Sequence, residues 1–182
     1  MEFRELSGQR IRLINLSIEY LHDIHEYSIM SQFYVHLEYS PFKDLEETRA
    51  FLNKLFKRSD EITGHYWLIY HILEKKVIGT IGLLDIDSRK GAAELAYGLS
   101  PNFWGMGFFS EALNLVINWY FSLDGTYRLF IKTAVNNTNS IKAAKNLGFE
   151  KEGVLRGYYL DGKTSQRWDA ALLSLLRSDI IK

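Results

Sequence analysis

The sequence predicts a single α+β domain over residues 1–182, in which helices pack on one β-sheet. Apolar patterns follow one another in the order strand, two helices, a run of strands, helix, strand, helix and two closing strands, an order typical of the α+β class. The length allows one hydrophobic core and is short for two. Hydrophobic residues make up 47% of the chain and charged residues 24%, as in ordinary globular proteins, and no linker, repeat or low-complexity tract interrupts it.

The first part of the chain predicts one strand and two helices. Residues 11–16 are apolar and alternating, which favours a strand, and Ser17 can cap the helix that follows. Asp44, with Glu47 three residues later, resembles a capping box at the start of the second helix. The apolar face of that helix consists of Leu45, Phe51, Leu52, Leu55 and Phe56.

The middle of the chain predicts a hairpin, a further strand and a helix. Residues 65–73 and 77–85 are rich in aromatic and apolar side chains, and a charged EKK turn separates them. In the next strand, residues 92–99, alternation places Glu94, Ala96 and Gly98 on the face opposite Leu95. A loop follows and leads into a helix with an apolar side formed by Phe109, Leu113, Val116, Ile117 and Tyr120.

The last part of the chain predicts a strand at 127–135, a short helix and two closing strands. Asn139 or Ser140 can cap the short helix, and Gly148 is a typical helix end. The closing strands, 149–160 and 168–176, join near Asp161-Gly162, a dipeptide that favours a hairpin turn.

Charge and composition exclude several classes of function. Lys and Arg total 22, as do Asp and Glu, so the net charge of zero argues against a nucleic-acid binder that relies on bulk electrostatics. The chain has no Cys, which excludes disulfides, thiolate metal sites and Cys nucleophiles. His22 and His25 have a spacing that could bind metal, but no third ligand lies nearby in the sequence, so we expect no metal site.

The N-terminal sequence MEFRELSGQR carries charges where a signal peptide needs apolar residues. The longest apolar runs are also far shorter than the roughly 20 residues of a membrane-spanning helix. We therefore expect a cytoplasmic protein.

The most informative segment is LSPNFWGMGFFSEA at residues 99–112, a loop between a strand and a helix. Gly105 and Gly107 allow backbone N–H groups to turn toward one point, and the helix N-terminus adds partial positive charge. Such a loop can bind a pyrophosphate. The residues alone also allow a plain tight turn, and they lack the third Gly of a dinucleotide fingerprint and the Lys of a Walker loop.

This loop and its surroundings resemble the GNAT acetyltransferases, most of all the RimJ/RimL-like branch of ribosomal-protein N-terminal and spermidine acetyltransferases. The family loop, Q/R-x-x-G-x-G/A, corresponds to WGMGFF at residues 104–109, and Trp often replaces the leading Gln or Arg in this branch. AELAYGLSP before it, NNTNSIKAAKNLGFEKEGVLR after it and the closing strands are also similar, so the resemblance covers nearly the whole chain. It implies a GNAT-like acyl-CoA N-acyltransferase fold, with a mixed, mostly antiparallel central sheet flanked by about four helices.

The resemblance also implies acetyl-CoA as the cosubstrate and assigns residues to it. The backbone of Leu99 would pair with the pantetheine amides, and Gly98 would leave room for the pantetheine arm, so Gly98→Val is expected to block acetyl-CoA without unfolding the protein. Asn136, Asn139 and Ser140 would contact the arm, although loop and cap roles would also explain them. The pyrophosphate would be bound by Trp104, Gly105, Met106, Gly107, Phe108 and Phe109.

Two positions depart from the family pattern. Phe109 stands where the family usually has Gly or Ala, but its side chain can point away because N–H groups make the contacts. Ala144 stands where many members have a Tyr general acid, so that acid is absent.

Transfer of an acetyl group to an amine requires the amine to lose a proton, because α-amino groups have a pKa near about 8 and Lys near about 10.4. By the resemblance, Glu94 is the candidate base, acting through water, and the alternative is an exposed carboxylate without a role. Ser140 is the candidate acid, with a helix cap or a cofactor contact as alternatives. Since the chain has no Cys, direct transfer in a ternary complex is simpler than a thioester-enzyme intermediate.

Two classes of function fit these observations. The first is an N-acetyltransferase acting on a primary amine, with a protein N-terminus favoured by the branch and polyamines, other small amines or antibiotics as alternatives. The second is a non-catalytic acyl-CoA-binding regulatory domain on the same fold, which Phe109 and the missing Tyr favour. The segment 34–39, with Glu38, corresponds to the acceptor region of the fold and could suit a cationic amine, or it simply packs on the sheet. Members of the branch are often dimers, so a homodimer is one expectation.

Overall fold

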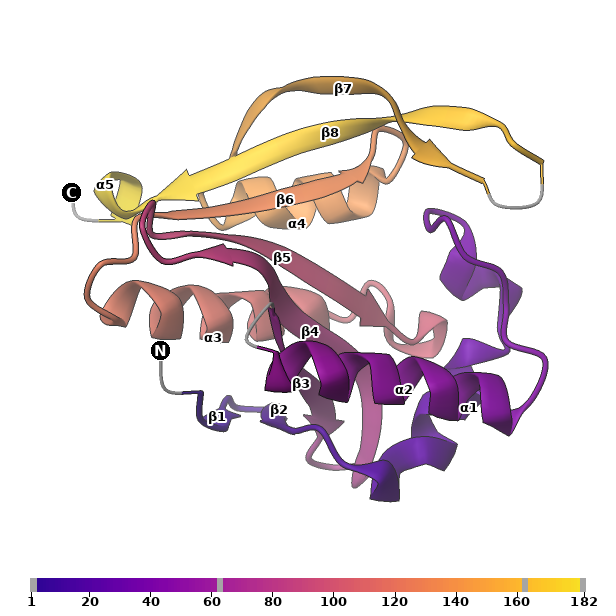
Figure 1. Cartoon of the computed structure of the whole chain (residues 1–182). Helices are drawn as coiled ribbons and strands as arrows, with labels where there is room; N and C mark the ends of the chain where they lie inside the picture. The colour runs from indigo at the N-terminus through magenta and orange to yellow at the C-terminus, as the bar shows by residue number, and fades with distance from the viewer. Residues whose placement is uncertain (1–2, 62–63, 162–163, 181–182) are drawn as a thin grey trace.

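The computed structural model describes residues 3–61, 64–161 and 164–180, so Gly162 of the expected hairpin turn lies outside the described residues. Thirteen strands and α-helices follow one another along this part of the chain (Figure 1). They are β1 (Leu6–Ser7), β2 (Ile11–Asn15), α1 (Leu21–Ser28), α2 (Leu45–Asp60), β3 (Gly64–His71), β4 (Lys76–Asp87), β5 (Ala92–Leu99), α3 (Phe108–Ser122), β6 (Arg128–Ala134), α4 (Thr138–Asn146), β7 (Glu150–Leu160), β8 (Arg167–Leu176) and α5 (Arg177–Ile180). Short 3-10 turns occur at Ile18–Tyr20, Ser31–Tyr34 and Pro101–Phe103. The α+β prediction is confirmed.

All eight strands belong to one sheet, in the order β1-β2-β3-β4-β5-β6-β8-β7. Neighbouring strands are antiparallel except for β5 and β6, which run parallel. A mixed, mostly antiparallel sheet is therefore observed, as the resemblance implied. The parallel pair is joined through α3, because a parallel connection needs a crossover that packs on the face of the sheet.

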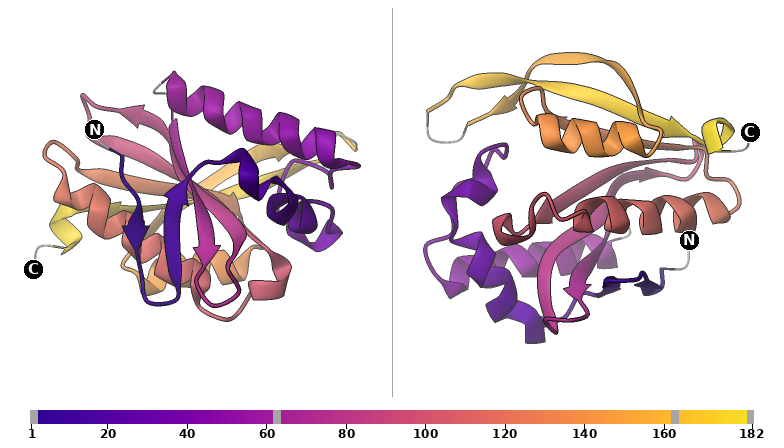
Figure 2. Two further views of the ribbon diagram at one scale, coloured as in Figure 1. Left: turned by 90° about the horizontal axis from the view of Figure 1, so that it is seen from below. Right: turned by 180° about the vertical axis from the view of Figure 1, so that it is seen from behind.

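The helices lie on both faces of the sheet. α1 and α2 cover one face, whereas α3 and α4 cover the other (Figures 1 and 2). The larger core lies between the sheet and α3, where Trp67, Leu95 and Tyr120 are almost fully buried. A second cluster, which includes Ile24, Leu52 and Leu68, fills the space between the sheet and α1 and α2. Each face of the central strands thus packs against a different layer of helices.

Side-chain caps start helices α2 and α4, and the cap of α4 differs from the prediction. Asp44 accepts a hydrogen bond from the Glu47 N–H at 2.9 Å at the start of α2, while the Glu47 carboxylate accepts from the N–H of Lys43. Helix α4 is capped by Asn137, whose side chain accepts from the Ser140 N–H at 3.3 Å. Expecting Asn139 or Ser140 as the cap was wrong, because the chain enters the helical conformation already at Thr138, so that the cap lies two residues before Asn139.

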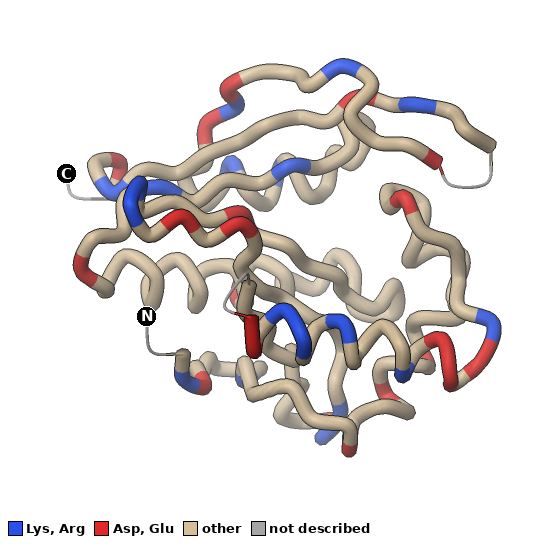
Figure 3. Tube along the Cα trace, viewed as in Figure 1, with Lys and Arg blue, Asp and Glu red and all other residues tan. Residues whose placement is uncertain are grey.

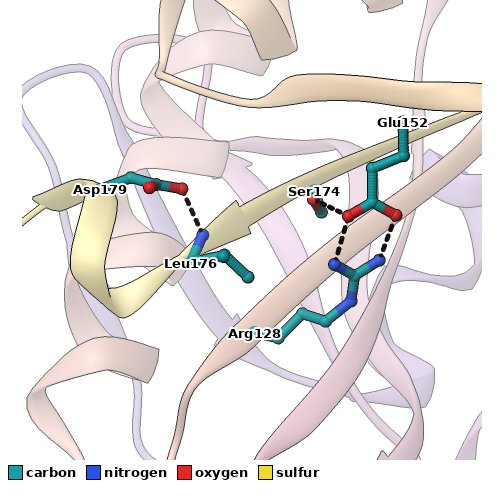
Figure 4. A network of polar contacts seen from close by, with 5 residues as sticks. All are labelled: Arg128, Glu152, Ser174, Leu176 and Asp179. Carbon is teal, nitrogen blue, oxygen red and sulfur yellow. Dashed lines mark hydrogen bonds and ion pairs between the residues drawn. The ribbon is translucent and has the colours of Figure 1, made fainter.

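A polar network ties the three strands at one edge of the sheet together (Figure 4). Glu152 of β7 accepts from both terminal nitrogens of Arg128 of β6, at 2.5 and 2.7 Å, and from the Ser174 hydroxyl of β8 at 2.6 Å. The hydrogen bonds from Arg128 hold the pKa of Glu152 at about 2. Where β8 ends, the Leu176 N–H donates to Asp179 at 2.9 Å at the start of α5.

Charged residues of both signs are interspersed along the chain, in keeping with the zero net charge (Figure 3). Among the residues described, no helix combines the length and the apolar character that crossing a bilayer requires.

Candidate active site

The centre of the sheet opens where β5 and β6 part. The two strands pair at only three positions, from Ala92 with Arg128 to Glu94 with Phe130, and they diverge beyond (Figure 1). The Ser100 N–H donates to the Ile78 carbonyl of β4 at 2.8 Å. Since successive residues of a strand direct their backbone groups to opposite sides, those of Leu99 face the side on which β6 has left. Leu99 is therefore placed as expected for a backbone that pairs with a ligand, although its carbonyl also accepts from the Trp104 indole at 2.7 Å.

The glycine loop at the end of β5 adopts the conformation that its glycines allow. Gly105 and Gly107 have φ values of +75° and +82°, in the left-handed region that glycine occupies without steric cost. Gly107 is the N-cap of α3 and provides no side-chain cap, so the first N–H groups of this long helix are not bonded by a capping side chain. A loop of this kind suits an anion such as a phosphate.

Arg10, at the start of β2, holds the glycine loop from one side. Its Nη1 donates to the Met106 carbonyl at 2.8 Å, and its Nε donates to Glu111 of α3 at 2.9 Å. The guanidinium also lies over the Phe108 ring, 4.4 Å from its centre. Burial would raise the pKa of Glu111, but the hydrogen bonds from Arg10 outweigh it and lower that pKa. Sequence reasoning missed Arg10, because only the packing of β2 beside α3 brings it to the loop.

Phe109, the first departure from the family pattern, turns away from the loop and packs on Tyr97 of β5, with ring centres 4.4 Å apart. Tyr97 in turn shares a short hydrogen bond with the hydroxyl of Ser140, the candidate acid on α4. Burial raises the pKa of Tyr97, against hydrogen bonds to Ser140 and Thr133 that lower it. Sequence alternation placed Tyr97 on the face of Leu95, but it gave no sign of the contact with α4.

Ala144, the second departure, is fully buried in α4. Of the two candidate Asn residues, Asn139 lies in the first turn of that helix, and Asn136 lies before its cap, two residues after the end of β6. Both Asn136 and Asn139 are exposed, and the side chain of Asn139 forms no hydrogen bond with the described part of the chain. Because Asn137 supplies the cap, Asn139 is left without a capping role.

Glu94, the candidate base, is the last residue of β5 that pairs with β6. It is not the exposed carboxylate of the alternative interpretation. Its side chain is 13% exposed and forms an ion pair with Lys132 of β6, with Nζ and Oε2 2.6 Å apart. Burial raises the pKa of Glu94, and the ammonium of Lys132 opposes part of that rise. Lys132 was also missed, because its place beside Glu94 depends on the register of two strands.

Gly98 and the segment before α2 meet on the face that carries α1 and α2. A Cβ on Gly98 would lie 2.6 Å from Cζ of Phe33, so the space beside Gly98 is filled by an aromatic ring and not kept open for a ligand. Further along that segment, Glu38 accepts from the Leu160 N–H of β7 at 2.7 Å. The segment 34–39 therefore reaches the end of β7.

Of the two histidines of α1, His25 bonds Thr48 of α2 through Nδ1 at 2.7 Å. The described residues contain no group of three side chains able to hold a metal ion.

Comparisons with known proteins agree with this geometry. A family model described as an acetyltransferase (GNAT) domain matches residues 10–150. The uncharacterized N-acetyltransferase p20 of Bacillus licheniformis is 30% identical over 174 residues, which cover 96% of this chain and 97% of that protein.

Two solved structures share the fold at low sequence identity. RimL, a ribosomal-protein alpha-N acetyltransferase solved with coenzyme A, has a TM-score of 0.84 at 18% identity, covering 95% of this chain and 98% of its own. The Vibrio cholerae spermidine N-acetyltransferase, solved with coenzyme A and spermine, has a TM-score of 0.80 at 19% identity. The match covers 96% of this chain and 100% of that protein. With the family model spanning most of the residues and the fold shared throughout, this chain belongs to the GNAT family of N-acetyltransferases.

Proposed function

We propose that this protein transfers the acetyl group of acetyl-CoA directly to a primary amine. The observation that carries the proposal is the parting of β5 and β6 after Glu94, next to a loop with two left-handed glycines at the N-terminus of α3. The parted strands offer backbone groups to the amides of a pantetheine arm, and the loop offers N–H groups to a pyrophosphate. The structural neighbours RimL and spermidine N-acetyltransferase, each solved with coenzyme A, support this assignment.

The residues present fit acetyl-CoA at this place. Phe109, which could have obstructed the loop, packs on Tyr97 and leaves the backbone of the first helical turn open. Leu99 presents its backbone to the parted side of β5, and Asn139 has no bond within the described chain that would have to break. We therefore assign the arm to Leu99 and Asn139, and the pyrophosphate to the loop 104–109.

For the chemistry we assign Glu94 as the base and Ser140 as the acid. Glu94 is a largely enclosed carboxylate at the parting point, on the strand face toward α1 and α2, and it would take the proton of the amine through a water molecule. Ser140 lies on the opposite face at the start of α4 and would donate to the leaving thiolate. Its hydroxyl is positioned by the hydrogen bond with Tyr97, in which either oxygen can be the donor.

The acceptor binds on the face that carries α1 and α2. Glu38 and Glu94 place carboxylates there, and Tyr158, bonded to the Lys132 partner of Glu94, brings an aromatic ring close by, which suits an amine that arrives protonated. A protein N-terminal α-amino group is the first candidate, and a polyamine or another small amine is the second. RimL and the Vibrio cholerae enzyme represent these two acceptor classes.

The test combines binding with turnover. We expect acetyl-CoA to raise the melting temperature in a saturable manner, since a ligand at about 100 times its Kd adds about 2.7 kcal/mol to the unfolding free energy. We further expect thiol release from acetyl-CoA with a panel of N-terminal peptides and polyamines, and Glu94→Gln should abolish it.

Each outcome separates the two classes of function. A melting shift without thiol release for any amine would favour the non-catalytic acyl-CoA-binding domain. No shift up to millimolar acetyl-CoA would overturn the proposal as a whole.

A further inference from the structure

The ion pair between Glu94 and Lys132 occupies the point where β5 and β6 part. Lys132 lies two residues beyond Phe130, the last residue of β6 that pairs with β5. Its Nζ approaches Oε2 of Glu94 to 2.6 Å, and the two side chains are only 16% and 13% exposed. The candidate base is therefore held by a cation from the strand on the other side of the opening.

A second contact fixes the ammonium from a third strand. Nζ of Lys132 donates to the Tyr158 hydroxyl of β7 at 2.6 Å, and it lies 5.0 Å from the centre of the same ring. It also lies 5.7 Å from the ring of Phe130. Lys132 is thus oriented by a hydrogen bond and two aromatic faces, and its position does not depend on Glu94 alone.

Stability does not account for this arrangement. Removing two charges from water costs several kcal/mol, and apolar side chains of similar size often replace a buried ion pair without loss. A nearly enclosed Lys beside the carboxylate that faces the acceptor therefore calls for a role in the reaction.

We propose that Lys132 is a positioning residue, whose ammonium keeps the carboxylate of Glu94 ionised and aimed at the amine; this inference rests on the proposed function. During transfer the amine nitrogen bonds to the acetyl carbon, the carbon–sulfur bond breaks so that coenzyme A leaves as the thiolate with the bonding electron pair, and the amine proton passes through water to Glu94. Lys132 keeps its own protons throughout. It acts only on the protonation state and orientation of its neighbour.

The electrostatic surroundings agree with this role. Burial raises the pKa of Glu94, and the hydrogen bond and the charge of Lys132 lower it. Within the described part of the chain, Lys132 is the cation that lowers this pKa, so removing it leaves an enclosed carboxylate that takes up a proton more readily. The other titratable groups that interact with Glu94 are Asp85 of β4, Tyr66 of β3, Tyr97 of β5 and Tyr159 of β7, and a negative charge on any of them acts in the same direction as burial.

The experiment compares Lys132→Met and Lys132→Arg with wild type by kcat/KM for the amine between pH 5.5 and 9. The ratio of variant to wild type at each pH removes the titration of the amine itself. Loss of a neighbouring cation raises a carboxyl pKa by about 1 unit or more, so the Lys132→Met ratio should fall as the pH is lowered from 9, approaching a roughly tenfold loss once the pH lies below the carboxyl pKa of both proteins. Lys132→Arg should keep most of the wild-type kcat/KM at low pH, because the variant retains the positive charge.

Lys76→Met is the matched control. Lys76 of β4 forms an equally short pair with Glu26 of α1, at 2.6 Å, away from the opening. The ratio of kcat/KM of Lys76→Met to that of wild type should not vary with pH. A Lys132→Met ratio that is flat with pH, or an Arg variant as impaired as the Met variant, would overturn the role of Lys132.

A second measurement does not require turnover. The carboxyl carbon of Glu94, followed by NMR during a pH titration, should show a higher pKa in Lys132→Met than in wild type. If wild type releases no thiol with any amine, the proposed function fails, and this titration still decides whether Lys132 controls the ionisation of Glu94. Equal pKa values in the two proteins would overturn that control.

Discussion

The guanidinium of Arg10 and the carboxylate of Glu111 join the start of β2 to the first turn of α3, with Nε and Oε2 2.9 Å apart. The Arg10 backbone N–H donates to the same carboxylate at 2.8 Å, so the strand end and the helix end are connected twice. A carboxylate at a helix N-terminus would repel an incoming phosphate, and Arg10 compensates that charge while it holds the loop through Met106.

We predict that Arg10→Gln weakens coenzyme A binding with little effect on kcat. Hydrogen bonds to charged groups contribute about 1.5–3 kcal/mol each, so the Kd measured by isothermal titration calorimetry should rise roughly tenfold. Arg12→Gln is the control, because Arg12 lies on the same strand but over the Tyr70 ring. An unchanged Kd for Arg10→Gln would show that the loop keeps its shape without Arg10.

Gly98→Ala should affect the amine more than acetyl-CoA. The new Cβ would press on Phe33, which lies on the acceptor face, and the ring must shift because 2.6 Å is far inside van der Waals contact. The KM for the amine should rise several-fold, while the Kd for acetyl-CoA stays near the wild-type value. The opposite pattern would restore the expectation that Gly98 makes room for the pantetheine arm.

Tyr97→Phe should lower kcat about fivefold and leave the KM for acetyl-CoA nearly unchanged. The variant keeps the ring that packs on Phe109 but removes the hydrogen bond to Ser140, a loss of roughly 1 kcal/mol in a typical case. Tyr97→Phe, Ser140→Ala and the double variant form a cycle. If the two hydroxyls act as one unit, the double variant should be no slower than Ser140→Ala. Fully additive losses would contradict that coupling.

Acid should destabilise the fold through His65. Its ring stacks on Phe3 with centres 3.8 Å apart, and burial lowers its pKa from 6.5 to about 4. The unfolded chain therefore binds a proton that the folded chain refuses between these pH values, so the unfolding free energy decreases as the pH falls from 6.5 to 4.

Urea unfolding at several pH values in this window measures the effect. His65→Phe keeps a stacked ring without a titrating nitrogen, so its unfolding free energy should depend less on pH than that of wild type. An equal pH dependence in both proteins would assign the acid sensitivity to other groups.

Local sequence signals were sufficient to predict those elements that depend on residues close together in the sequence. The alternation in residues 92–99, the pair Asp44 and Glu47, and the glycines of the loop predicted β5, the start of α2 and the turn into α3. The cap of α4 was placed two or three residues too late, because Asn137, Asn139 and Ser140 can all cap a helix and only the backbone path selects among them.

The partners of the site residues could not be predicted in the same way. Arg10 and Glu111 are 101 residues apart in the sequence, and Tyr97 and Ser140 are 43 apart. The pairing of Glu94 with Lys132 depends on the register of a parallel pair only three positions long, and a shift of one residue would turn Lys132 to the other face.

The sequence by itself determined the α+β class, the order of the elements, the glycine loop and the family resemblance, because periodicity, caps and glycine conformations are properties of short segments. Tertiary structure alone decided that Glu94 is enclosed beside a cation, that Phe109 turns toward Tyr97, and that Phe33 fills the space beside Gly98. These contacts follow from strand register and helix packing, which join residues that no short segment contains.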